Sequence, residues 1–409
     1  MAAPSDIDIF DPAYLDDPYP MYRMLREQSP VWRVPGTDFF LVTSWDLVTE
    51  AATRVEDFSS NLTGVMIHQP GGPPLVFDMD GGGRAVHVLA TADDPVHAAH
   101  RKLVFPYLGK RVRGLGPLVQ GLVDRLWHEE LRGDRIDLAT GIADRLPLGV
   151  VADLIGVPAQ DVPQLLAWAY DSTEMLGGVV AEGRLASLVT SAAELAGYLH
   201  DQLACALASP EGTMPGLLDV LASACRRGDL EPEVAVLILV QLVGAGGEST
   251  AGLIANAARI LAERPDLQDR LRADTAAIPA FLEEVVRVES PFRGHHRHIT
   301  RATTLGGVAL PEGGHLLLMW GAANRDPGIF ADPDIVDMDR PSGRTTLAFG
   351  KGAHFCIGTA LARMEAVAAI TALLENSTAF GLVDDAPPRW VPSLMVRRHA
   401  SLPLWVRQR

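Results

Sequence analysis

The sequence predicts a mainly α-helical protein with a small β portion, folded as one continuous unit. Helical patterns of apolar residues dominate the chain from about residue 90 to about 290 and again over about 356–375. Strand patterns are short and fall in three ranges, roughly 30–60, 292–320 and 380–409. Neither a Ser/Gly-rich linker nor an internal repeat divides the 409 residues. We therefore expect a single domain over 1–409.

Each expected helix has its own signals of periodicity and of start or stop. The expected helices span, in chain order, roughly 17–28, 94–108, 116–132, most of 160–208, 231–264, 264–274 and 278–290. Pro265 suits the first turn of its helix, because an N-terminal N–H has no intrahelical partner to lose. Pro291 should end the helix before it.

The strand signals are fewer. "FFLVTS" at 39–44 and "LPLWV" near the end read as strands, and "LGGVALPEGGHLLLMW" at 305–320 reads as a hairpin punctuated by glycine. Residues 321–348 carry Asn, Asp, Pro and Gly without periodicity, so we expect an ordered loop there.

Composition excludes several classes of function. The chain has 35 Lys and Arg against 51 Asp and Glu, a net charge of −16, which argues against a nucleic-acid partner. The acidic start has no apolar segment of a signal peptide or membrane anchor. The longest apolar run, 234–247, is shorter than the ~20 residues a membrane span needs. The chain has only three cysteines, which indicates a reducing, cytoplasmic setting. We also expect a monomer.

Cys356 stands just before a helical pattern and just after Gly350 and Gly352. Three interpretations compete: a buried inert thiol, a nucleophile with His354 as its base, and a metal-ligating thiolate. Zinc would require further ligands at short spacing, which the neighbourhood lacks. A haem iron needs a single axial thiolate, and glycines would let the loop lie against a flat ring.

"FGKGAHFCIG" (349–358) resembles F-x-x-G-x-[HR]-x-C-x-G, the cysteine-ligand loop of the cytochrome P450 family. The resemblance implies a triangular, helix-rich domain with haem between a long distal helix and the helix after the cysteine. It implies that Cys356 is the axial ligand of a non-covalently bound haem b. By the same resemblance, Phe349 packs near the sulfur, Gly358 leaves a backbone donor to it, and His354 binds a haem propionate.

Other segments are similar to the family's pattern. Glu284 and Arg287, three residues apart on a helix, could be a surface ion pair. The family instead buries an E-x-x-R pair with a later arginine, which here is Arg340, as a structural triad. "DDPVHAAHRKL" places His97 and Arg101 on one helix face, either a solvated face or, by resemblance, two propionate donors.

A third propionate donor follows from the segment 295–313. Counted back from the G-V-x-L-P turn, Arg297 rather than Arg301 matches the family's propionate arginine. The nearby His295, His296 and His298 could suggest a metal site, but an extended segment alternates its side chains and would spread them apart. Two readings stay open for Arg293, His295 and His296, namely binding a polar substrate group or facing solvent.

The long helix contains "GAGGESTAG" (244–252), where four glycines leave room beside an acid and two hydroxyls. One interpretation is a kinked helix with a solvated Glu. By resemblance to the family's [AG]-G-x-[DE]-T-[TS], Ala245 and Gly246 line the haem, whereas Glu248, Ser249 and Thr250 are catalytic. Ser249 stands where the family has Thr, so it keeps the hydroxyl and loses the methyl that restricts rotation. We expect oxygen activation to survive with weaker coupling of electrons to product.

The resemblance implies a haem-thiolate monooxygenase that hydroxylates or otherwise oxidises a small hydrophobic molecule with dioxygen. The sequence has no flavin or iron–sulfur motif, so electrons should come from a separate ferredoxin and ferredoxin reductase that dock near Lys351 and Arg363. A catalytically silent haem-binding protein and a peroxide-driven enzyme are the alternatives. The expected walls of the substrate pocket are 62–90, 165–205, 240–244, 291–296 and 394–395, with 69–86 as a mobile lid.

Overall fold

The computed structural model describes residues 7–69, 71–340 and 346–409. Its helices are α1 Pro12–Asp16, α2 Tyr19–Gln28, α3 Trp45–Thr53, α4 Val96–Val112, α5 Gly116–Glu130, α6 Arg145–Ile155, α7 Val162–Leu176, α8 Arg184–Ala208, α9 Gly216–Arg226, α10 Pro232–Glu263, α11 Pro265–Ala273, α12 Ile278–Val288, α13 Trp320–Ala323 and α14 Thr359–Glu375. Shorter turns are η2 Leu89–Thr91, the π-helical η3 Ala139–Ala143, η4 Ala159–Asp161, η5 Thr275–Ala277 and η6 Gly352–His354.

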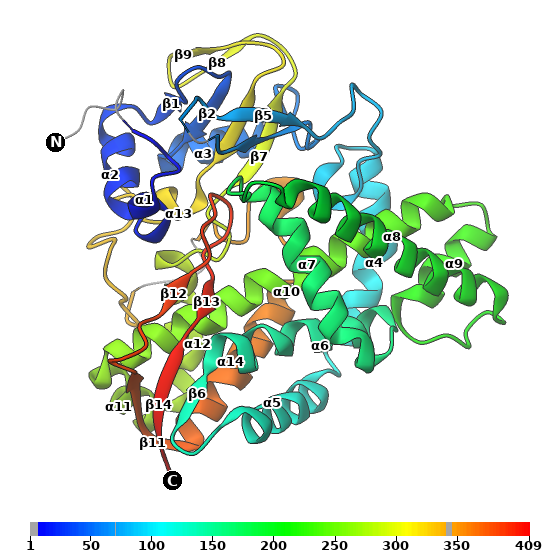
Figure 1. Ribbon diagram of the computed structural model, residues 1–409. Helices are drawn as coiled ribbons and strands as arrows, with labels where there is room; N and C mark the ends of the chain where they lie inside the picture. Colours follow the sequence, from blue (N-terminus) through cyan, green and yellow to red (C-terminus); the bar gives the residue numbers. More distant parts are fainter. Residues whose placement is uncertain (1–6, 70, 341–345) are drawn as a thin grey trace.

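The strands are β1 Val31–Arg33, β2 Phe39–Val42, β3 Phe58–Ser59, β4 Gly64–Ile67, β5 Leu75–Asp78, β6 Arg135–Asp137, β7 His295–Ile299, β8 Thr303–Leu305, β9 Val308–Leu310, β10 His315–Leu318, β11 Ser377–Leu382, β12 Arg389–Trp390, β13 His399–Ser401 and β14 Pro403–Gln408. Five of them form one sheet in the order β1-β2-β10-β7-β3, and β11-β14-β6 form another. Figure 1 shows the five-stranded sheet with α1–α3 in the upper part of the molecule and the helical bulk below it.

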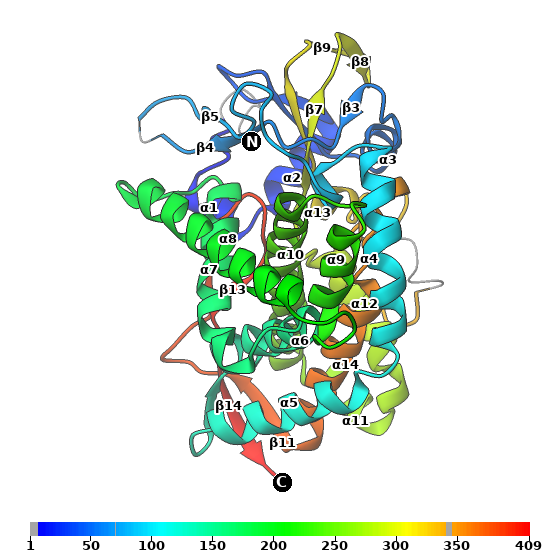
Figure 2. The same cartoon turned by 90° about the vertical axis from the view of Figure 1, so that its right-hand side faces the viewer.

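Helix α10 is the centre of the helical bulk. It packs against α6, α7, α8, α12 and α14, and most of its second half is buried. Figure 2 shows α10 enclosed by these neighbours. Among the described helices it alone is long and apolar enough to cross a membrane, but half of that apolar window is buried in the protein. A core helix passes the same test, and its packing accounts for its hydropathy.

The helices predicted from periodicity are confirmed, with ends displaced by a few residues. The predicted range 160–208 is broken at 177–183, where Gly178 and Gly183 have positive φ. The predicted hairpin over 305–320 is wrong in its pairing. The hairpin that forms is β8–β9, whereas β10 lies between β2 and β7 in the five-stranded sheet. Its apolar side chains are buried there, which a two-stranded hairpin could not achieve.

The expected loop 321–348 begins with the last residues of α13, and its residues 341–345 lie outside the described part of the chain. The expected mobile lid, 69–86, contains β5, which pairs with β4 in a two-stranded ribbon. Residue 70 of that range is likewise outside the described residues. The sequence patterns did not indicate α6 or the β4–β5 ribbon.

Candidate functional site

Cys356 lies in a tight loop between η6 and α14. Its backbone N–H donates to Phe349 O at 2.9 Å, and Gly350 and Gly352 on either side of Lys351 have φ of +72° and +70°. The N–H of Gly358, the N-cap of α14, donates to Cys356 Sγ at 3.3 Å. The sulfur therefore sits at a helix N-terminus and accepts a backbone hydrogen bond there.

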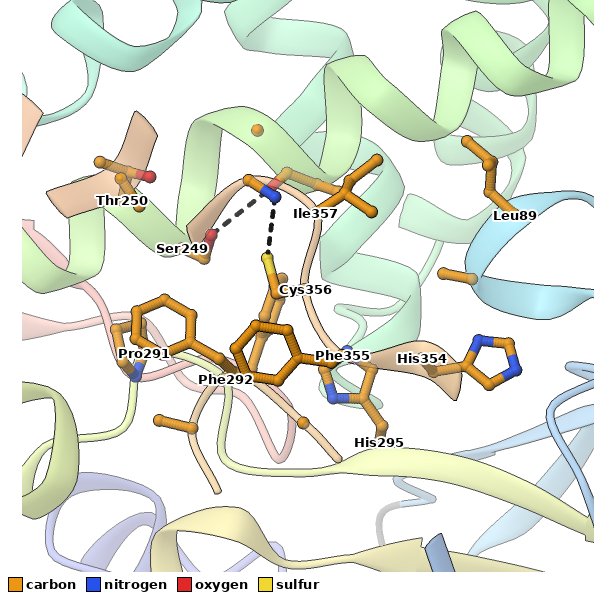
Figure 3. A pocket seen from close by; sticks show the side chains of 18 of the residues that line it. Leu89, Ser249, Thr250, Pro291, Phe292, His295, His354, Phe355, Cys356 and Ile357 are labelled. Carbon is orange, nitrogen blue, oxygen red and sulfur yellow. Dashed lines mark hydrogen bonds between the residues drawn. The ribbon is translucent and has the colours of Figure 1, made fainter. Parts of the chain in front are cut away.

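The Cys356 side chain opens into a large cavity. Its empty volume is about 1420 Å³, including the open mouth, and its walls come from η2, α4, α10, residues 286–297, Trp320 and residues 348–362. Figure 3 shows Ser249, Pro291, Phe292 and His295 around this thiol. The cavity extends from the cysteine loop to α10, so a group bound in it would lie between the thiol and the long helix.

One end of the cavity gathers the four cationic or imidazole side chains expected there. The rings of His97 and His354 lie 4.1 Å apart, and Arg101 Nη1 donates to Phe355 O at 2.8 Å. Arg297, which is 6% exposed, uses Nη1 to bond His296 O at 2.7 Å.

Arg297 is a buried cation without a counter-ion. Among the described residues no carboxylate forms an ion pair with it, and burial, only partly offset by the more distant Asp93, lowers its pKa to about 10. Arg301, the residue not chosen, pairs instead with Asp57 at 2.5 Å, outside the cavity. A buried guanidinium that faces a cavity without an anion favours an anionic ligand. The donor set thus fits a group that carries carboxylates.

His295 also lines the cavity, whereas Arg293 and His296 do not. The indole N–H of Trp320 donates to His295 Nδ1 at 2.6 Å, and burial lowers the pKa of His295 to about 3. His296 packs edge-on against Phe39, with both ring nitrogens unpartnered. Arg293 is buried and donates to the carbonyl of Leu15. For Arg293 both readings from the sequence are therefore wrong, because its side chain reaches neither the cavity nor solvent. His296 does not line the cavity either, but it is partly exposed.

The metal interpretation of the histidine cluster gains no support from geometry. In the parts of the chain that the structure describes, no three His, Cys, Asp or Glu side chains converge as metal ligands. His298 instead shares Thr63 with His315, at 3.0 and 2.9 Å from its hydroxyl.

On α10, Ala245, Gly246, Ser249 and Thr250 line the cavity. Ser249 Oγ donates to Ala245 O, one turn back, at 3.2 Å, as serines within helices commonly do. The two hydroxyls are therefore beside the cavity, as the sequence pattern predicts.

Glu248 does not line the cavity. It is 2% exposed, and its Oε1 accepts from Arg398 Nε at 2.9 Å. Arg398 Nη1 also lies 3.6 Å from Asp144 Oδ1, which accepts a hydrogen bond from Tyr170 OH at 2.5 Å. Successive helix residues point about 100° apart, and here Ser249 and Thr250 fall on the cavity side of α10 whereas Glu248 points toward Arg398. The expectation that the acid stands beside the two hydroxyls at the gap is corrected here.

The glycines of α10 also serve a different purpose from the one expected. A Cβ on Gly246 would lie 2.5 Å from Val151 Cγ2, and one on Gly247 would lie 1.7 Å from Leu148 Cδ2. Both neighbours belong to α6. These two glycines allow α6 to approach α10, whereas the side facing the cavity is formed by Ala245 and by the backbone of Gly246.

The E-x-x-R pair is buried, so the surface interpretation is wrong. Glu284 and Arg287 are 3% and 2% exposed and are joined at 2.8 Å. Arg340 Nε donates to Glu284 at 3.1 Å, and Arg287 also donates to the carbonyls of Asn324, Pro333 and Ile335. The triad ties α12 to the segment before the cysteine loop.

The expected pocket walls are correct only in part. Residues from 89–90, 241–242 and 291–295 line the cavity, whereas none from 165–205 or 394–395 do. The sequence reasoning missed Trp320, Val286 and Leu361. For Trp320 a signal was present, because an indole N–H at the end of a buried strand requires an acceptor.

Known proteins share this arrangement. The cytochrome P450 family model matches residues 208–380. "Cytochrome P450 144" of Mycobacterium tuberculosis is 45% identical over 393 residues, which cover 96% of this chain and 89% of the relative. "Beta-dihydromenaquinone-9 omega-hydroxylase" of Mycobacterium bovis is 31% identical over 96% of this chain and 77% of its own length. The solved structure of "cytochrome P450 CREJ in complex with (4-ethylphenyl) dihydrogen phosphate" superposes with a TM-score of 0.87 at 26% identity, over 99% and 100% of the two chains.

A helix-rich fold in which a cysteine thiol faces a long helix across a cavity, together with these relatives, defines a haem-thiolate oxidoreductase. The chain belongs to the cytochrome P450 family. The family implies a haem with a cysteine ligand, and the residues present fit such a group: an accessible thiol, a large cavity and a buried arginine without a counter-ion.

Proposed function

We propose that this P450 holds haem b without a covalent link, with Cys356 as the axial ligand, and oxidises a small hydrophobic organic molecule. The observation that carries this proposal is the position of the Cys356 thiol, which accepts the N–H of Gly358 and opens into the cavity that Ser249 and Thr250 also line. Among the cysteines, Cys205 and Cys225 lie on α8 and α9, away from the cavity lining.

The anionic edge of the cofactor would lie against the donor group at one end of the cavity. Arg297, Arg101, His97 and His354 supply donors for two propionates, and Arg297 gains the counter-ion that it lacks. Phe349 lines the cavity close to the cysteine loop. The Arg363 guanidinium lies over its ring, 4.7 Å from the centre.

A bound haem thiolate supplies the oxygen-activating chemistry, since the thiolate favours cleavage of the O–O bond. The chain supplies orientation and protons. The Ser249 hydroxyl can turn from Ala245 O toward the cavity, and Thr250 offers a second hydroxyl there. Glu248 is held outside the cavity lining by its ion pair with Arg398.

The electron donors that we propose are a ferredoxin and its reductase. The substrate should be largely apolar, because Leu89, Leu242, Leu253 and Phe292 contribute to the cavity walls. Unlike a hydroxylated ligand, an apolar one leaves no unsatisfied group against these side chains. We also propose that the protein acts as a cytoplasmic monomer.

The first prediction concerns the ligand. The reduced protein with carbon monoxide should show the spectrum of a thiolate-ligated haem, and Cys356→Ser should lose it because a serine hydroxyl does not replace a thiolate. Cys205→Ser, at an exposed position on α8, is the matched control and should keep the spectrum. A Cys356→Ser protein with the unchanged thiolate spectrum would contradict the assignment.

Turnover then separates the alternatives. Product formed with ferredoxin, reductase, NADPH and dioxygen supports the monooxygenase. Product formed only with peroxide would indicate a peroxide-driven enzyme, and haem binding without either reaction would indicate a silent protein. The peroxide released per NADPH in the first assay measures how well the enzyme, with Ser249 at this position, couples electrons to product.

A further inference from the structure

Gln241 is the one polar side chain in the apolar run at the start of α10, and it lines the cavity. Both polar atoms of its amide are hydrogen-bonded. Oε1 accepts from the backbone N–H of Ala90 at 2.9 Å, and Nε2 donates to Thr91 Oγ1 at 3.0 Å. Both partners belong to η2, about 150 residues earlier in the chain, so this one side chain joins the long helix to a turn at the rim of the cavity.

The turn that Gln241 holds carries a cavity wall. Leu89 and Ala90 both line the cavity, and Figure 3 shows Leu89 at its edge, on the other side of Cys356 from Ser249 in that view. Leu89 has a φ of +38°, in a region that residues other than glycine rarely adopt. Such a conformation persists only where the surroundings hold it. Gln241 supplies two of the hydrogen bonds that do so.

On its N-terminal side the turn is closed by hydrogen bonds between Val88 and Thr91, but the segment before Val88 is loosely held. Residues 81–86 are exposed, and Gly81, Gly82 and Gly83 all have positive φ. The hydrogen bonds of Arg84 and Ala85 return to Asp80 within the same segment. The N–H of Leu89 has a long contact, 3.4 Å to His100 Nδ1, and its carbonyl accepts from Ala92 N–H at 3.2 Å.

The C-terminal side of the turn is anchored more firmly. Two residues after η2, Asp93 Oδ1 accepts from the backbone N–H of Ser60 at 2.8 Å. The turn therefore has a fixed end and a loosely held end, and the Gln241 amide lies between them.

We propose that Gln241 is a positioning residue that sets which substrates fit, because it holds the Leu89–Thr91 turn over the cavity. This inference rests on the proposed function for its meaning. Each polar atom of the Gln241 amide already has a partner in the turn, and the substrate meets the apolar side chain of Leu89 at this wall. Release of the turn would widen the cavity toward residues 81–86.

The test measures the turn and the cavity separately, in the haem-loaded protein. Gln241→Leu has a similar volume and no hydrogen bonds, so the amide of Ala90 should exchange with deuterium about tenfold faster or more. The optical titration of imidazole and of 4-phenylimidazole reports cavity size, and the affinity of the larger ligand relative to the smaller should rise several-fold.

Two further variants make the test specific. Gln241→Glu can still accept from Ala90 N–H and from the Thr91 hydroxyl, so it should restore most of the slow exchange. Gln120→Leu removes an exposed glutamine of α5 that bonds Asp124, and it should change neither measurement. If Gln241→Leu does not fold, Thr91→Val removes the bond from Gln241 Nε2 together with the side-chain bonds between Thr91 and Val88, and it should accelerate exchange at Ala90.

Unchanged exchange at Ala90 in Gln241→Leu and Thr91→Val would overturn the inference, as would faster exchange with an unchanged ratio of the two affinities. Failure of the wild type to bind haem would overturn the proposed function instead. The exchange measurement on the apoprotein would still show whether Gln241 holds the turn.

Discussion

Glu365 is a carboxylic acid buried in the middle of α14. It is 1% exposed, its Oε1 has no hydrogen-bond partner among the described residues, and burial raises its pKa well above the usual value. Because the folded pKa lies above the unfolded one, the unfolded chain releases this proton more readily. The free energy of unfolding should therefore fall as pH rises above about 4.5, the ordinary range of a Glu.

Glu365→Gln should remove this loss, because an amide resembles the neutral acid. We expect the variant to melt at a higher temperature than the wild type near neutral pH and at about the same temperature near pH 4.5. Glu375→Gln, at the exposed end of the same helix, is the control and should show no such divergence. Parallel melting curves of Glu365→Gln and wild type across this pH range would contradict the explanation.

At the residue scale, the sequence predicted the cavity residues on the cysteine loop, on α4 and on β7. These residues belong to short motifs that resemble the family's, and their spacing does not depend on packing elsewhere in the chain. Sequence reasoning misjudged Glu248, whose direction depends on Arg398, 150 residues away. It also misjudged Arg293, which bonds Leu15 at the opposite end of the chain. A motif gives the position of a residue along a helix or strand, whereas its partner comes from tertiary structure.

At the element scale, the contact between α6 and α10 depends on two glycines. Gly247→Ala gains about 0.8–1.0 kcal/mol of helix propensity but places a methyl group 1.7 Å from Leu148 Cδ2. Overpacking of this kind costs ~1–3 kcal/mol. Leu148 is fully buried, so its side chain has little room to move. We expect Gly247→Ala to lower the denaturation midpoint.

Gly244→Ala is the matched control on the same helix. A Cβ there meets no atom within 4 Å, so only the propensity gain applies and the midpoint should rise. Urea titration of the two variants against wild type measures both effects. Shifts of the same sign in the two variants would show that the contact with α6 does not decide the choice of glycine.

Most helices were predictable because their apolar faces repeat with a clear period. The β4–β5 ribbon was not, since Leu75 and Val76 are exposed on it and give no buried alternation. The pairing of β10 could not be predicted from the sequence pattern either. His315–Leu318 resembles one arm of a hairpin, but its partners, β2 and β7, lie far away in the chain or across a turn that the pattern did not show.

The whole molecule has a net charge of −16, whereas the surface around the cysteine loop carries basic side chains. Lys351 lies in this loop, and Arg101 bonds its Phe355 carbonyl. Arg363 is less available, since its guanidinium pairs with Glu283, at 2.9 Å between Nη2 and Oε2. Lys351 is therefore the better residue with which to examine the docking of an acidic ferredoxin.

Lys351→Glu should slow electron transfer from the ferredoxin several-fold at low ionic strength and weaken its dependence on salt, because charges at the rim of an interface mainly affect association. Stopped-flow reduction at several salt concentrations measures this. Arg227→Glu, in the turn after α9 and outside the cavity lining, makes the same change of charge and should leave the rate unaltered. Equal rates and salt slopes for Lys351→Glu and wild type would disprove docking at this surface.

Arg398 connects the segment before β13 to the central helix α10. It precedes β13 by one residue, and its guanidinium neutralises the acid in the central helix. Proteolytic clipping ahead of this arginine would strand an uncompensated negative charge in the interior. The same cut would also take β14 out of its place between β11 and β6, so its effects would extend beyond the Glu248 ion pair.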